Sequence, residues 1–137
     1  MSVLVRTILA SAAMSVPFPG MVSAETAVEA QVYMDCRFAT ECYEAEGCQE
    51  AVFAATLVGR ASGDEMIDLA AEIEMRSDNG DVMLAGTLSN GALGLYGGAG
   101  LGRHMLSVSA DGAARYTVHL ANGPQAVTYL GRCEAVQ

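Results

Sequence analysis

Short turn signals recur along the second half of this chain and constrain its fold more than any other feature. Four of them pair Asn or Asp with glycine: Asn79-Gly80, Asn90-Gly91, Asp111-Gly112 and Asn122-Gly123. Such pairs tolerate the positive φ angles that tight hairpin turns require. Five short runs that are predicted as strands surround them: Val82–Leu88, Ala92–Tyr96, Arg103–Ser109, Ala113–Ala121 and Ala126–Cys133. This spacing of strands and turns is typical of an antiparallel meander.

Three further strands are predicted before these, over Val32–Phe38, Ala51–Val58 and Glu65–Arg76. Ala51–Val58 is apolar at both odd and even positions, which suits a strand buried on both faces. Glu65–Arg76 is ambiguous, because its Ala, Glu and Met residues favour helix whereas its apolar residues alternate strictly with charged and small ones. We predict a strand there, since long alternation outweighs propensity. The acidic segment Ala39–Gly47 is expected to hold one helical turn that ends at its glycine.

The predicted fold is therefore all-β, a small antiparallel meander of seven to eight strands. Closure into a flattened barrel is favoured because it removes exposed strand edges, and a two-sheet sandwich is the alternative. Residues 25–137 fit a single domain of modest core.

The N-terminal segment is predicted to be a secretory signal peptide over residues 1–24. Arg6 precedes the uncharged run Thr7–Val16, two prolines follow, and small residues end the segment at Ala24. The run is shorter than the roughly 20 residues that span a bilayer, so no stable membrane anchor is expected after cleavage. We expect a periplasmic or secreted protein.

Four cysteines follow the predicted signal: Cys36, Cys42, Cys48 and Cys133. An even number in a small exported domain is read as a disulfide framework. We favour Cys36–Cys133 with Cys42–Cys48, because the first pair ties the opening strand to the closing one. The alternative joins Cys36 to Cys48 and Cys42 to Cys133.

A zinc site formed by three of these thiolates with His104 or His119 is the competing interpretation of the cysteines. Their spacing, Cys-x5-Cys-x5-Cys, is wider than in most structural zinc sites, and an oxidising compartment favours disulfides. We expect no metal or cofactor.

The charge balance is strongly acidic. The whole chain carries a net charge of −9 and no lysine, and removal of Arg6 with the signal peptide lowers the charge to −10. Such a surface repels phosphate backbones and anionic headgroups, so nucleic acid is excluded as a partner. A basic periplasmic or extracellular protein suits the charge.

No catalytic motif is present in the sequence, so we do not expect an enzyme. His104 and His119 belong to no His-x-x-x-His pair, and no Gly-x-Ser-x-Gly elbow accompanies them. The glycine run Gly91–Gly102 lacks the lysine of a phosphate-binding loop and is interpreted as a loop between strands. Four carboxylates, those of Glu41, Glu44, Glu46 and Glu50, crowd the disulfide loop but lack the ligand pattern of a calcium loop.

The leading functional hypothesis is a non-enzymatic protein-binding or inhibitory module. Its candidate binding residues are Arg115, Tyr116 and His119 together with the glycine loop, because Arg and Tyr are favoured interface anchors. The alternative is a metal-binding protein or small enzyme that uses the acidic segment and the histidines.

The segment Ala110–Tyr116 (ADGAARY) is similar to the Ser-Gly-x-Arg-Tyr segment of periplasmic c-type lysozyme inhibitors. Asp111 stands in place of the serine, and one residue is inserted before Arg115. The tryptophan and lysine of the family's next segment are absent. The resemblance implies a flattened β-barrel, a loop that enters a lysozyme cleft and a basic enzyme as partner.

Overall fold

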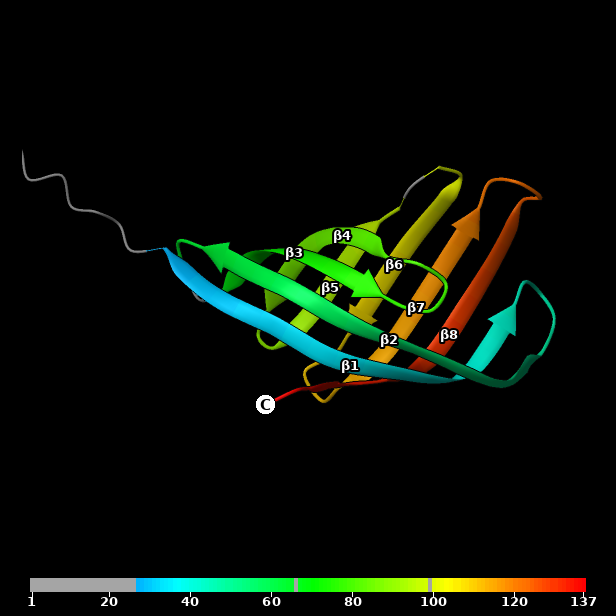
Figure 1. The fold of residues 1–137 in the computed structure, drawn as a ribbon, viewed down its shortest axis with the longest axis horizontal. Coiled ribbons are helices and arrows are strands. Elements are labelled where there is room, and N and C mark those ends of the chain that lie inside the picture. The colour runs from blue at the N-terminus through cyan, green and yellow to red at the C-terminus, as the bar shows by residue number, and fades with distance from the viewer. Residues whose placement is uncertain (1–26, 66, 99) are drawn as a thin grey trace, which may run out of the picture.

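The computed structural model describes residues 27–137 except 66 and 99; the predicted signal peptide, residues 1–24, lies outside them. Eight strands follow one another along the chain: β1 Val28–Tyr43, β2 Cys48–Gly63, β3 Asp68–Arg76, β4 Val82–Ser89, β5 Ala92–Gly97, β6 Gly102–Val108, β7 Ala113–Leu120 and β8 Gln125–Ala135. Each strand pairs antiparallel with the next, and β1 also pairs with β8, so the sheet closes into a barrel (Figure 1). The predicted all-β barrel is confirmed, and the sandwich is not formed.

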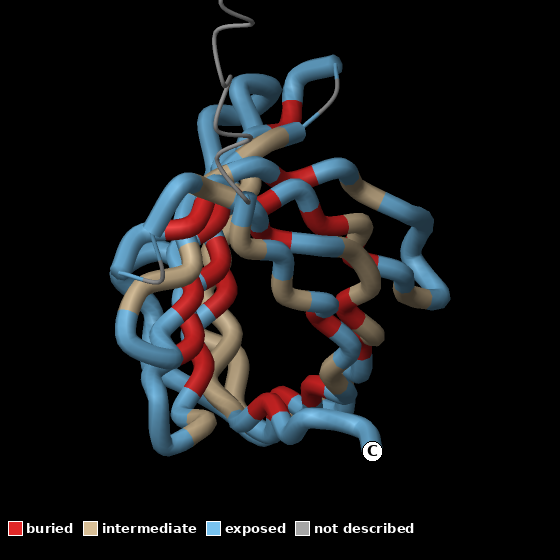
Figure 2. The backbone as a smooth tube through the Cα atoms, turned by 90° about the vertical axis from the view of Figure 1, so that its left-hand side faces the viewer, coloured by how far each residue is buried: buried red, intermediate tan, exposed pale blue. Residues whose placement is uncertain are grey.

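Alternation along each strand separates the barrel interior from its outer surface. In β3 the side chains of Leu69, Ala71, Ile73 and Met75 are buried, whereas the residues that alternate with them are exposed or half-buried. Buried and exposed positions also alternate along β5 and β6, whereas most of β8 is half-buried (Figure 2). Residues 68–76 of the ambiguous segment thus form a strand, because period-2 burial against the barrel interior overrides the helical preference of Ala and Glu.

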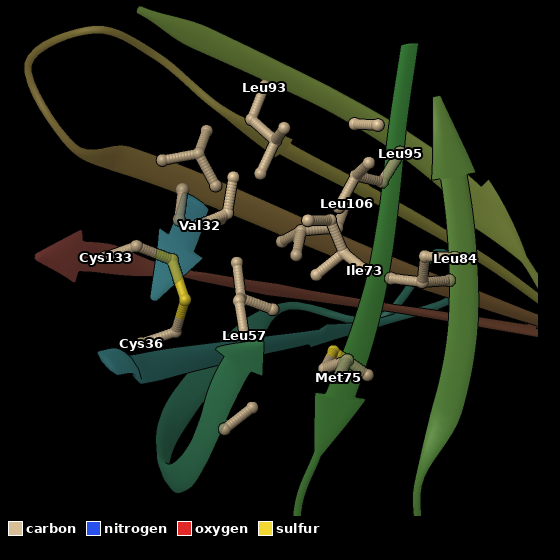
Figure 3. Packing of buried hydrophobic residues seen from close by; sticks show 14 of the residues in the cluster. Val32, Cys36, Leu57, Ile73, Met75, Leu84, Leu93, Leu95, Leu106 and Cys133 are labelled. Atoms are coloured by element: carbon tan, nitrogen blue, oxygen red, sulfur yellow. A yellow bond between two sulfur atoms is a disulfide. The ribbon is translucent and has the colours of Figure 1, made fainter. Parts of the chain in front are cut away.

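The interior is filled by two kinds of side chain. Aliphatic residues such as Leu57, Ile73, Leu95 and Leu106 pack toward one another (Figure 3). Each such buried side chain contributes about 1.5–3 kcal/mol through removal from water. Aromatic residues form a second group, in which Phe38 contacts rings from β2, β7 and β8.

Both predicted disulfides are present. Cys36 lies opposite Cys133 in the β1–β8 register, and Cys42 lies opposite Cys48 across the β1–β2 hairpin. All four thiols are therefore used, which removes the thiolate zinc site. Two disulfides indicate a non-cytoplasmic, oxidising environment. In the part of the chain described here, no helix has the length and apolar character to cross a membrane.

The acidic segment differs from its prediction. Ala39–Tyr43 continues β1 instead of forming a helical turn, and the reversal follows at residues 44–47. The strand persists because it pairs on both sides: Thr40 lies opposite Glu50 on β2 and Leu130 on β8. A β-bulge before Thr40 shifts the register there.

Two further predictions were wrong in detail. Val52 on β2 is fully exposed, so this strand is buried on one face only, as a closed barrel provides a single interior. Much of the glycine run is strand β5, which ends at Gly97, and of the described residues before β6 only 98, 100 and 101 lie outside a strand. Glycine is required on β4 beside it, because a Cβ at Gly86 would lie against the carbonyl oxygen of Gly94.

The turns after β1, β3, β5 and β7, at residues 44–47, 77–81, 98–101 and 121–124, belong to one end of the barrel. They lie toward the right-hand side of Figure 1. We call this the mouth end.

Candidate functional site

The three predicted binding residues all lie on β7, but the structure does not bring them onto one surface. Tyr116 is only 4% exposed and belongs to the barrel interior. Arg115 is exposed on the outer face, and His119 is exposed nearer the mouth end. This separation follows from strand alternation, since adjacent residues face opposite sides.

A groove with a volume of about 620 Å³ lies on the outside of the barrel near His119. Its lining includes Tyr96, Met105 and Thr117, which are neighbours in register across β5, β6 and β7. Tyr96 is 66% exposed and Met105 is 59% exposed. We call this the outer groove, and its character is largely apolar.

One cationic side chain, that of Arg103, borders the outer groove toward the mouth end. Arg103 lies opposite His119 in register. Its Nη1 donates hydrogen bonds to the carbonyl oxygens of Gly100 and Gly102, at 3.1 and 2.8 Å. Leu101, in the same loop, is exposed and lines an adjoining hollow with Arg103 and His119. The structure thus places the glycine loop beside His119, whereas Arg115 lies farther along β7.

The charges of the protein are divided between two sides of the barrel. Fourteen of the sixteen acidic residues precede Val82, whereas the stretch from Val82 to Cys133 holds one, Asp111. Asp111 lies in the turn after β6 and not on a strand. Because the strands are arranged in chain order, β1–β3 carry an acidic side, whereas among β4–β8 only β8 carries a carboxylate, that of Glu134. The outer groove lies on the side of β4–β8. One further carboxylate lies near the groove: Glu44 lines the adjoining hollow with Arg103 and His119, and it accepts a hydrogen bond from the Ala126 N–H.

Inside the barrel, Tyr116 is paired with a histidine that sequence reasoning treated as isolated. The Tyr116 hydroxyl lies 2.5 Å from Nδ1 of His104, and the two rings stack with centroids 5.8 Å apart. Burial raises the pKa of Tyr116 to about 12 and lowers the pKa of His104. Both groups are therefore uncharged at neutral pH. The alternation of His104 with Leu106 and Val108 was the signal for its inward position.

Two more rings complete this cluster. Phe53 lies 5.0 Å from Tyr129 and 5.7 Å from Tyr116, measured between ring centroids. The pKa of Tyr129 is raised, first by burial and then by the neighbouring Glu41 carboxylate. The cluster therefore offers aromatic surface and phenol hydroxyls that stay protonated at neutral pH.

The segment that resembles lysozyme inhibitors forms the tight turn between β6 and β7. The Asp111 carboxylate accepts hydrogen bonds from the Ser109 hydroxyl and from the Ala113 N–H. The Ser109 bond is the main reason why the pKa of Asp111 is lowered. Arg132 donates to the Asp111 carbonyl from β8. These bonds hold the turn in place and give Asp111 a structural role.

In comparisons with known proteins, no family model matches the chain, and neither a curated protein nor a solved structure is significantly similar to it. Among residues 27–137 other than 66 and 99, no three His, Cys, Asp or Glu side chains are grouped closely enough to hold a metal ion. The site is therefore interpreted from its own chemistry.

Proposed function

We propose that the protein is a non-enzymatic binding module of the periplasm or extracellular space. Its outer groove would hold an apolar segment of a partner protein that carries flanking acidic residues. The observation that supports this proposal is the exposure of Tyr96 and Met105 in one groove, beside Arg103 and His119.

The apolar lining supports a protein partner. Contiguous exposed apolar side chains are uncommon on proteins that bind nothing, and Tyr, Met and Arg are enriched at the centres of interfaces. Tyr96 and Met105 are neighbours across β5 and β6, so one apolar side chain of a partner can contact both. A closed barrel holds these residues on rigid strands, which lowers the entropy cost of binding.

The charge division supports an acidic segment rather than a basic one at this groove. Arg103 and Arg115 lie on β6 and β7, and the only carboxylate between Val82 and Cys133 is that of Asp111. A basic partner would be attracted instead to the acidic residues of β1–β3. A basic protein therefore remains a predicted partner, but for the acidic side and not for the outer groove.

Site-specific photo-crosslinking tests this proposal. A photoreactive phenylalanine analogue replaces Tyr96 in one sample of the mature protein and Tyr33 in a matched sample. Tyr33 is 50% exposed and lines a hollow beside Glu72 and Glu74 on the acidic side. After incubation with an extracytoplasmic extract, we expect one protein to be crosslinked from position 96 and not from position 33. Added acidic peptide with an apolar residue should compete for it.

Crosslinking of the same proteins from both positions, or only from position 33, would refute the outer groove as the site. Crosslinking that a basic peptide inhibits better than an acidic one would refute the proposed partner chemistry.

A further inference from the structure

A second hollow opens inside the barrel at its mouth end, and it shares only one lining residue, His104, with the outer groove. Its volume is about 240 Å³. Rings of Phe53, Tyr116 and Tyr129 line it together with His104, and the β3–β4 turn contributes Ser77 and Asn79. We call it the mouth cavity. Mouths of β-barrels are frequent positions of small-molecule sites.

We propose that the mouth cavity binds a small uncharged ring compound that carries a hydrogen-bond acceptor, such as a phenol or an indole derivative with an oxygen substituent. None of the described residues that line it carries an Asp, Glu, Lys or Arg side chain. This neutral lining is unusual in a chain with a net charge of −9. A charged ligand would lose its hydration there without a countercharge.

The aromatic residues set the shape of the ligand. The rings of Phe53, Tyr116 and Tyr129 lie within 5.8 Å of one another between centroids. Aromatic rings pair favourably in stacked and edge-to-face arrangements, so a planar ligand gains more from this cluster than an aliphatic one. An apolar cavity of about 150 Å³ is sufficient for benzene, and the mouth cavity is larger.

His104 supplies the hydrogen bond. With Tyr116 protonated and His104 uncharged, the Tyr116 hydroxyl donates to Nδ1, 2.5 Å away. The imidazole proton then resides on Nε2, which is a donor for an oxygen of the ligand. Apart from His104, the residues that line the mouth cavity are separate from those of the outer groove.

Titration of the mature, disulfide-bonded protein with phenol and with 5-hydroxyindole tests the proposal. Calorimetry should show saturable binding, and nuclear magnetic resonance should show intermolecular contacts from the ligand to Tyr129 and Val118. We expect benzoate, the charged analogue, to bind at least about tenfold more weakly than phenol, because its carboxylate would be desolvated.

Val118→Phe, which fills the cavity from β7, should weaken phenol binding about tenfold or more. Met105→Ala, on the outer face, should leave it unchanged. If Val118→Phe fails to fold, the magnetic resonance contacts between the ligand and the wild-type protein still decide whether the ligand occupies the mouth cavity. Absence of saturable binding, ligand contacts to Tyr96 and Met105 instead of Tyr129, or equal binding of benzoate and phenol would overturn the inference.

Discussion

Gly86 and Gly94 show how single residues set the distance between strands. Gly86 on β4 approaches β5 so closely that a Cβ would contact the carbonyl oxygen of Gly94. Gly94 itself has open space where its own Cβ would lie, with no atom within 4 Å. Two glycines on neighbouring strands therefore differ in how much they tolerate substitution.

Gly86→Ala is predicted to destabilise the protein by about 1–3 kcal/mol, because β4 and β5 must separate to accommodate the methyl group. Gly94→Ala is the matched control and should stay within about 0.5 kcal/mol of the wild type. Urea unfolding of both variants measures the difference. An equal loss in the free energy of unfolding of the two variants would contradict the close approach of β4 to β5 at Gly86.

The environment of His104 predicts a specific pH dependence. Burial lowers the pKa of His104 from its ordinary value of about 6.5, so the folded state releases this proton more readily than the unfolded state. As pH falls below about 6.5, the unfolded state takes up the proton first and the free energy of unfolding decreases. The loss is complete once pH is below the folded pKa.

A resonance titration of the His104 imidazole in the folded protein should give a midpoint below the ordinary value. His104→Gln should reduce the decrease in the free energy of unfolding between neutral pH and mild acid, because this variant has no imidazole to protonate at that position. A midpoint at or above about 6.5 would refute the buried, neutral histidine.

The two disulfides connect elements in different ways. Cys36–Cys133 joins β1 to β8 across a sequence separation of 97 residues, whereas Cys42–Cys48 closes a hairpin of separation 6. A disulfide restricts the unfolded chain more when it closes a longer loop, so Cys36–Cys133 restricts it more than Cys42–Cys48 does.

Replacement of Cys36 and Cys133 by Ala is predicted to cost about 4–5 kcal/mol, against about 2 kcal/mol for replacement of Cys42 and Cys48. Thermal or denaturant unfolding of the two double variants provides the comparison. A larger loss from the hairpin pair would contradict this order.

Among the elements, β3 and the end of β1 show what the sequence could and could not predict. The alternation of Leu69, Ile73 and Met75 sufficed for β3, because burial against the barrel interior repeats every second residue. The segment Ala39–Tyr43 has no such alternation, and its strand depends on partners on β2 and β8. Long-range pairing of this kind leaves no local signal.

The same limit applies to the candidate site at the scale of the whole molecule. Adjacent residues of a strand face opposite sides, so the sequence itself contains the signal that separates Tyr116 from Arg115 and His119. The outer groove, however, needs Tyr96 and Met105 side by side, and their β5–β6 register comes from the closed barrel. The division of charge was present in the sequence, but only the order of strands around the barrel gives it a spatial meaning.

The most direct test of the proposed function compares two matched double variants for affinity toward the partner crosslinked from position 96. Tyr96→Ala with Met105→Ala removes the apolar side chains of the outer groove. Tyr33→Ala with Met83→Ala removes the same residue types from the hollow that Glu72 and Glu74 line, where both are also exposed, at 50% and 63%. Neither pair contributes to the buried core, so both variants should fold.

We predict that the groove variant loses about tenfold or more in affinity, that the control variant binds as the wild type does, and that added salt weakens the wild-type complex. Unchanged affinity of the groove variant, or a greater loss in the control, would contradict the central claim that this protein binds its partner through the outer face of β5–β7.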